Sequence, residues 1–208
     1  MSFTLSSNTL NLIKNCSKLC YTTHKQSNSK YNINRFNNNL TIVSFPGTRS
    51  GYKDWVYNLD IRENNSGFHT GFQYKYDKIK EHLHEQLKNC DTPLVFTGYS
   101  SGAAVATLAS LEYFPKSKHC VIFGSPNFCI QDFSDKFMEL LPQSYNVTLQ
   151  GDPVVYAGSA YYSIGHHISL DSNGTFVYKD YPRTSIYTDE MTINQHCITS
   201  YNEVIEGL

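Results

Sequence analysis

Short apolar runs alternate with segments of helical periodicity along most of this chain, and this alternation limits the possible folds. The runs are rich in β-forming residues and bounded by Gly, Pro or Asp, as buried strands are; they span residues 40–45, 93–98, 120–125 and 146–150. Between them, apolar residues recur every three or four positions over residues 72–87 and 133–141, as in helices, and residues 103–111 are small and helix-favouring. The order predicts an α/β fold, a mostly parallel sheet with helices on both faces.

The two ends of the chain extend this pattern. Residues 1–24 and 197–208 have helical spacing, and residues 31–36 are compatible with an edge strand. Residues 161–178 look like a hairpin that turns at 171–174, because Asp, Ser, Asn and Gly favour tight turns. The sequence contains neither an internal repeat nor a linker, so we expect one domain over residues 1–208.

Charge and hydropathy exclude several functional classes. With 17 basic and 18 acidic residues, the chain has a net charge of −1 and lacks the basic character of a nucleic-acid-binding protein. No apolar run approaches the roughly 18 residues of a membrane-spanning helix, so we expect no transmembrane segment. The first residues lack a basic start followed by a long apolar run, the pattern of a secretory signal. We therefore expect an intracellular, cytoplasmic protein with free cysteines.

Residues 98–102 read Gly-Tyr-Ser-Ser-Gly and match the pattern G-x-S-x-G. In this pattern a strained turn between a strand and a helix lifts a nucleophilic serine clear of the sheet, and the residues two before and two after it must be small. Both positions are glycine for Ser100, whereas Tyr99 would clash if Ser101 were the nucleophile. A predicted strand precedes the turn and a predicted helix follows it. We therefore favour Ser100 as a nucleophile over a glycine-rich packing turn.

Partners for a serine nucleophile occur later in the chain. Asp152 follows a predicted strand, at the strand end where α/β sheets place active-site groups, although Asp-Pro is also a common turn pair. Three histidines follow Asp152: His166 and His167 in the predicted hairpin, and His196 just before the last helix. We favour His196 as the general base. No histidine pair has the helical spacing of metal ligands, so we expect neither a metal nor a cofactor.

Six blocks along residues 40–205 together resemble the class 3 lipase family of the α/β-hydrolase fold. In this sequence the blocks are Phe45-Pro46-Gly47-Thr48-Arg49-Ser50 with Asp54-Trp55, His69-Thr70-Gly71-Phe72, Gly98-Tyr99-Ser100-Ser101-Gly102-Ala103, Phe123-Gly124-Ser125-Pro126-Asn127, Asp152-Pro153-Val154-Val155, and His196 with Tyr201. The blocks occur in the family's order and at plausible spacing, so the joint match is far more specific than any single block.

The resemblance implies a serine hydrolase that cleaves carboxylic esters of lipids, in the manner of a triacylglycerol lipase or esterase. It implies a triad of Ser100, Asp152 and His196. It also implies that Thr48 and Ser101 form the oxyanion hole. The family's lid would lie just after Thr48, and its apolar contacts with a lipid surface would come from Tyr52, Trp55, Val56 and Tyr57. Core packing of the single tryptophan is an equal alternative for Trp55.

The chain departs from the family pattern at several positions. Pro46 and Asn127 stand where the family has arginines, and Tyr99 and Ser101 replace the usual His and Leu of the elbow. None of these changes removes a triad residue. A phospholipase or an acyltransferase could use the same triad, and a non-catalytic domain that binds lipid or protein could share the fold. The expected partners are a lipid or small ester substrate and, transiently, a lipid surface.

Overall fold

The computed structural model describes residues 5–26, 28–36, 39–49, 67–158, 161–174 and 193–208. The described residues form a six-stranded sheet in which the strands follow their chain order. The strands are β1 (Asn32–Phe36), β2 (Leu40–Phe45), β3 (Leu94–Tyr99), β4 (Ser117–Phe123), β5 (Tyr145–Leu149) and β6 (His166–Leu170). Strand β1 is antiparallel to β2, and all other neighbours are parallel. The predicted α/β class with a mostly parallel sheet is confirmed.

The expected hairpin over residues 161–178 is only partly correct. Residues 171–174 do form a turn, in which the Gly174 amide donates to the Asp171 carbonyl at 3.1 Å. However, β6 is a sixth strand that runs parallel to β5, not the first arm of an antiparallel pair. The proposed return arm, from residue 175 on, lies outside the described residues. Turn chemistry identified the local reversal, whereas the strand pairing depends on contacts with a distant segment.

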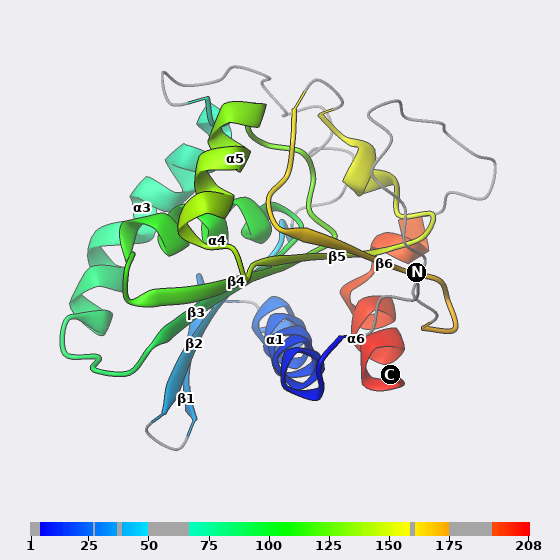
Figure 1. The fold of residues 1–208 in the computed structure, drawn as a ribbon, viewed down its shortest axis with the longest axis horizontal. Coiled ribbons are helices and arrows are strands. Elements are labelled where there is room, and N and C mark those ends of the chain that lie inside the picture. Colours follow the sequence, from blue (N-terminus) through cyan, green and yellow to red (C-terminus); the bar gives the residue numbers. More distant parts are fainter. Residues whose placement is uncertain (1–4, 27, 37–38, 50–66, 159–160, 175–192) are drawn as a thin grey trace.

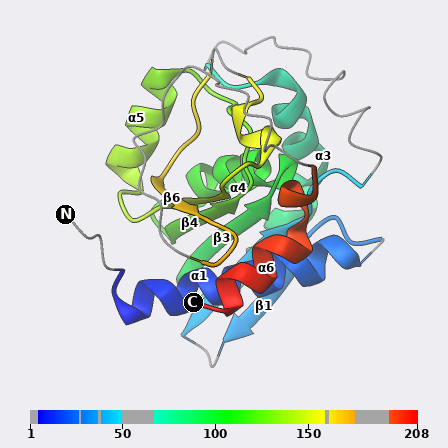
Figure 2. The ribbon, with the colours of Figure 1, turned by 90° about the vertical axis from the view of Figure 1, so that its right-hand side faces the viewer.

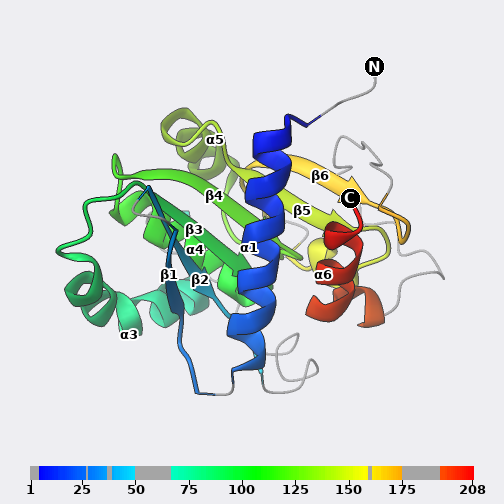
Figure 3. The same cartoon turned by 90° about the horizontal axis from the view of Figure 1, so that it is seen from below.

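Helices cover both faces of the sheet (Figure 1). The helices are α1 (Ser7–Lys25), α3 (Thr70–Leu87), α4 (Ser101–Glu112), α5 (Gln131–Leu140) and α6 (Ile198–Glu206). In Figure 1, α3, α4 and α5 lie on one face, and α1 and α6 lie on the other. Figures 2 and 3 show α1 and α6 side by side beneath the sheet. No described helix is long and apolar enough to cross a membrane.

The packing of the helices follows their sequences. Five apolar residues of α3 repeat at helical spacing and are buried: Phe72, Tyr76, Ile79, Leu83 and Leu87. Helix α4 instead lies between α3 and the sheet, where ten of its twelve residues are buried. Its small side chains, among them Ala103, Ala106 and Ala109, allow this close approach. As a result, the first turn of α4 is held firmly at the carboxyl end of β3.

Candidate active site

Ser100 occupies a sharp turn between β3 and α4. Its φ of 56° lies in a region that residues other than glycine rarely adopt. Both flanking glycines are required by close backbone approach: a Cβ on Gly98 would lie 2.1 Å from the Gly102 carbonyl oxygen, and one on Gly102 would lie 2.5 Å from the Phe45 oxygen. Strained backbone of this kind is found at functional sites, where the surrounding structure maintains it. The turn therefore has the local geometry of a nucleophile elbow.

Asp152 follows β5 and is completely buried. The Val154 amide donates to its Oδ1 at 2.8 Å, and the Tyr201 hydroxyl donates to its Oδ2 at 2.7 Å. Gly124, at the end of β4, leaves room for this pair, because a Cβ there would lie 3.1 Å from both Asp152 Oδ2 and the Tyr201 oxygen. These contacts fix the carboxylate in one orientation and satisfy it within the protein interior.

His196 joins the other two side chains. It ends the short 3₁₀ helix η2 (Ile193–His196), just before α6, and its Nδ1 lies 2.8 Å from Asp152 Oδ2. Its Nε2 lies 2.9 Å from Ser100 Oγ. The Asp152 carboxylate can only accept a hydrogen bond, so the imidazole of His196 carries its proton on Nδ1. Its Nε2 then accepts a hydrogen bond from the Ser100 hydroxyl. The three residues selected from the sequence thus form one hydrogen-bonded chain.

Tyr99 holds the histidine from the side. The two rings stack with centroids 5.1 Å apart and an interplanar angle of 27°. The Tyr99 hydroxyl also donates to the His196 backbone carbonyl. Burial raises the pKa of this phenol, so it stays protonated as a donor. In the sequence, Tyr99 served to reject Ser101 as the nucleophile and was noted as a departure from the usual elbow. The structure shows that it contacts both the ring and the backbone of His196.

Tyr201 supports the carboxylate from α6. It is fully buried, and its hydroxyl accepts from the Leu149 amide at 3.0 Å while donating to Asp152. Burial and the nearby Asp152 raise the pKa of this phenol, which therefore remains a donor. The sequence placed a tyrosine shortly after His196 but assigned it no role. The short spacing between His196 and Tyr201 was the signal that could have indicated this role, because one turn of helix brings the tyrosine side chain back toward the site.

A second polar cluster adjoins the nucleophile. Thr48 Oγ1 lies 2.9 Å from Ser101 Oγ, and the Lys75 ammonium donates to the same Thr48 oxygen at 3.2 Å. Ser101 is the first residue of α4, so its amide is among those that the helix leaves without an internal acceptor. The side chain of Lys75 is exposed overall, but local burial of its ammonium lowers its pKa. Sequence reasoning included Thr48 and Ser101 and missed Lys75.

The remaining predicted site residues lie elsewhere. Tyr52, Trp55, Val56 and Tyr57 fall outside the described residues. The two other late histidines are in β6, where His166 Nε2 contacts the Pro142 carbonyl oxygen at 2.8 Å and His167 Nε2 contacts Thr148 Oγ1 at 3.2 Å. Neither forms part of the chain from Ser100 to Asp152. Within the described parts of the protein, no cluster of three or more His, Cys, Asp or Glu residues could hold a metal ion.

Comparison with known proteins yields one family and a consistent fold. The family described as lipase (class 3) matches residues 33–159. The chain is similar to a Rhizomucor miehei lipase in complex with its propeptide, with 15% identity over 92% of this chain and 80% of that one, and a TM-score of 0.72. A lipase from Rhizopus microsporus var. chinensis matches with 14% identity over 99% of this chain and 89% of that one, and a TM-score of 0.68.

A third solved structure is that of a triacylglycerol lipase whose catalytic centre is formed by a serine protease triad. It matches with 13% identity over 92% of this chain and 94% of that one, and a TM-score of 0.70. At this level of identity the similarity establishes a shared fold. The overall arrangement of strands and helices is therefore that of these proteins.

Proposed function

Because this chain belongs to the lipase (class 3) family, and is thus a hydrolase of carboxylic esters, we propose that Ser100, His196 and Asp152 are its catalytic triad. The observation that carries this proposal is the unbroken pair of hydrogen bonds, 2.9 Å from Ser100 to His196 and 2.8 Å from His196 to Asp152. Distances of this size are those required for proton transfer to a general base. The proposed substrates are carboxylic esters of lipids, as for the triacylglycerol lipase with a similar fold.

In the proposed reaction, His196 Nε2 removes the Ser100 proton as Oγ attacks the ester carbonyl. Asp152 keeps the imidazole in the correct tautomer and stabilises the imidazolium that forms. The same imidazolium then protonates the leaving alcohol, which departs and leaves an acyl-enzyme. Water, deprotonated by His196, attacks the acyl-enzyme, and the carboxylic acid leaves with Ser100 restored. The positive end of the α4 dipole faces the negative charge that develops at each step.

We further propose that Thr48 and Ser101 bind the oxyanion. A hydroxyl accepts two hydrogen bonds and donates one. In this scheme the Ser101 hydroxyl, like Lys75, donates to Thr48 Oγ1, and the hydroxyl hydrogen of Thr48 points to the oxyanion. The second donor in this scheme is the Ser101 amide at the start of α4. Each such donor is worth about 10²–10³ in rate, because the negative charge forms only in the transition state.

Labelling by a fluorophosphonate probe tests the proposed nucleophile, because such probes react with serines activated by a general base. We expect wild-type protein to be labelled at Ser100 and the Ser100→Ala variant to remain unlabelled. Ser134→Ala is the matched control, since Ser134 lies on α5 and its hydroxyl donates to the Ser163 carbonyl at 2.8 Å. Labelling that survives Ser100→Ala, or no labelling of folded wild-type protein, would contradict the proposal.

Hydrolysis of ester series tests the substrate class. Nitrophenyl esters of increasing acyl length would be compared below and above the concentration at which they form micelles. A lipase prefers long acyl chains in aggregates, whereas an esterase works best on short, monomeric substrates. The labelling experiment tests whether Ser100 is the nucleophile, and the ester series tests only which esters are hydrolysed.

A further inference from the structure

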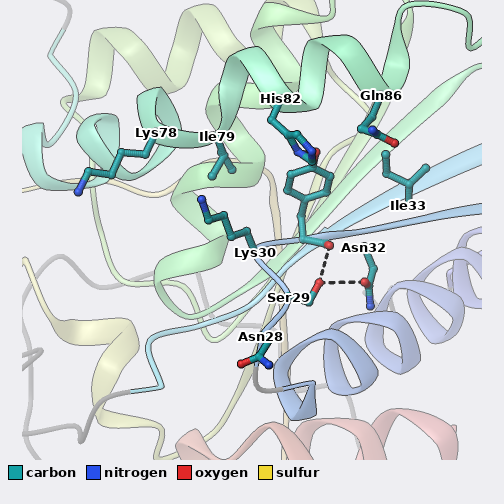
Figure 4. Close-up of a pocket in the computed structure, with 10 residues that line it drawn as sticks. Asn28, Ser29, Lys30, Asn32, Ile33, Lys78, Ile79, His82 and Gln86 are labelled. Atoms are coloured by element: carbon teal, nitrogen blue, oxygen red, sulfur yellow. Dashed lines mark hydrogen bonds between the residues drawn. The ribbon is translucent and has the colours of Figure 1, made fainter.

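A surface pocket of about 600 Å³ lies between the start of β1 and helix α3 (Figure 4). Two segments far apart in the sequence form its walls, residues 28–33 and residues 78–86. Pockets that bind small molecules have volumes of about 300–1,000 Å³, so this one is large enough for a ligand. None of the residues that line it belongs to the proposed triad or oxyanion hole.

The pocket carries two lysines from opposite walls. Lys30 comes from the loop before β1 and Lys78 from α3, and Figure 4 shows Lys30 extending from its loop toward the helix. Among the described residues that line the pocket there is no Asp or Glu. The Lys78 ammonium lies 4.1 Å from the centroid of the Tyr74 ring, which is not part of the lining. The described lining therefore carries two positive charges and no carboxylate.

The polar groups around these lysines are held in place. The Ser29 hydroxyl contacts the Tyr31 carbonyl oxygen at 2.6 Å and Asn32 Oδ1 at 3.0 Å, which orders the loop (Figure 4). The Tyr31 hydroxyl lies 2.6 Å from His82 Nδ1 and so connects the two walls. The side-chain amides of Asn28 and Gln86 also line the pocket, at its opposite ends (Figure 4). The protein's own side chains therefore fix the shape of the pocket.

We propose that this pocket binds a phosphate group carried by a small, partly apolar molecule such as a glycerol phosphate. A phosphate has close to two negative charges and several acceptor oxygens, which suits a pocket whose lining carries two ammonium groups. Ile33 and Ile79 supply apolar surface for the attached carbon skeleton. The phosphate could belong to a lipid headgroup at a membrane surface or to a soluble phosphate ester, since the chemistry of recognition is the same.

The pocket and the proposed active site are separate, but both use residues of helix α3. Lys75 contacts Thr48 and lies one turn of α3 before Lys78 and Ile79. Because α3 rises about 1.5 Å per residue, Lys78 is only about 5 Å further along the helix. The pocket and the Lys75–Thr48 contact therefore share helix α3. The binding itself does not depend on the triad, so it can be tested in the Ser100→Ala variant.

Titration of ¹⁵N-labelled protein with sn-glycerol 3-phosphate, and separately with inorganic phosphate, tests the site by NMR. We expect saturable shifts centred on residues 28–33 and 78–86. The double variant Lys30→Met/Lys78→Met should weaken binding at least about tenfold, because charge-assisted hydrogen bonds are lost. Lys80→Met is the matched control: Lys80 is exposed on the same helix but does not line the pocket. No saturable shift with either ligand and no vesicle binding, or equal weakening by Lys80→Met, would overturn the proposal.

Vesicle flotation distinguishes the two sources of the phosphate. The Ser100→Ala protein would be mixed with vesicles of phosphatidylcholine alone or with added phosphatidic acid. Binding that requires phosphatidic acid and is lost in the double lysine variant supports a headgroup ligand. Binding of glycerol phosphate without flotation supports a soluble phosphate ester. Flotation that persists in the double variant shows that lipid contact lies elsewhere and contradicts the pocket as the headgroup site.

Discussion

At the scale of single residues, Lys75 is the least expected member of the site. Its ammonium donates to Thr48 Oγ1, the hydroxyl proposed to face the oxyanion, and so brings a positive charge close to the reacting group. Lys75→Met should lower kcat about tenfold, with little change in KM, because the charge acts mainly on the transition state. The loss should be smaller than the roughly 10²–10³ expected for a direct oxyanion donor.

The pH profile separates this role from simple structural support. Partial burial lowers the pKa of Lys75, so its charge is lost at a lower alkaline pH than that of an exposed lysine. Activity that depends on this charge should fall as the pH rises through that pKa. Lys75→Arg should restore kcat and extend activity to higher pH, because arginine stays charged. If Lys75→Met and Lys75→Arg had the same alkaline profile as the wild type, Lys75 would have no electrostatic role.

At the scale of the elements, the elbow depends on backbone contact between β2, β3 and α4. A Cβ at Gly102 would lie 2.5 Å from the Phe45 oxygen and 2.6 Å from the Pro46 oxygen, and neither backbone can move away easily. Gly102→Ala should therefore destabilise the protein by about 1–3 kcal/mol, a typical cost of overpacking. Since each kcal/mol shifts Tm by about 2–4 °C in a protein of this size, thermal unfolding should show it clearly.

Gly207→Ala is the control for that substitution. Gly207 ends α6, and a Cβ there would meet only the Val204 and Glu203 oxygens at 3.4 and 3.6 Å. We expect its Tm to change by less than about 2 °C. Gly102→Ala should also shift Ser100 and lower kcat. A Gly102→Ala protein with wild-type Tm and kcat would show that the elbow tolerates a side chain there and that the close contact is not essential.

The elements also show what the sequence could predict. Glycine spacing selected Ser100 because the need for small residues is local and does not depend on the rest of the fold. Asp152 and His196 followed from their places at a strand end and before a helix. Lys75 and Tyr201 could not be assigned roles in this way, because their contacts join segments 27 and 49 positions apart. The direction of β6 was missed for the same reason.

At the scale of the whole molecule, two partly buried histidines link stability to pH. Burial lowers the pKa of His167 from 6.5 to about 4, and burial together with Arg49 and Lys25 lowers that of His24 to about 4. Unfolding exposes both imidazoles, which then take up protons below about pH 6.5. Between pH 6.5 and 4 the unfolded chain binds more protons, so the free energy of unfolding falls as the pH falls. This contribution is fully present above pH 6.5.

Urea unfolding at pH 7 and pH 5 measures this linkage. The wild-type midpoint should be lower at pH 5, and His167→Gln should reduce the difference between the two pH values, because glutamine does not titrate. Protonation of carboxylates also destabilises proteins in acid and contributes to the difference in midpoint between pH 7 and pH 5. The test is therefore how much His167→Gln changes that difference relative to the wild type. His84→Gln is the control, since His84 is exposed on α3. If His167→Gln and His84→Gln changed the pH dependence equally, burial of His167 would not be its cause.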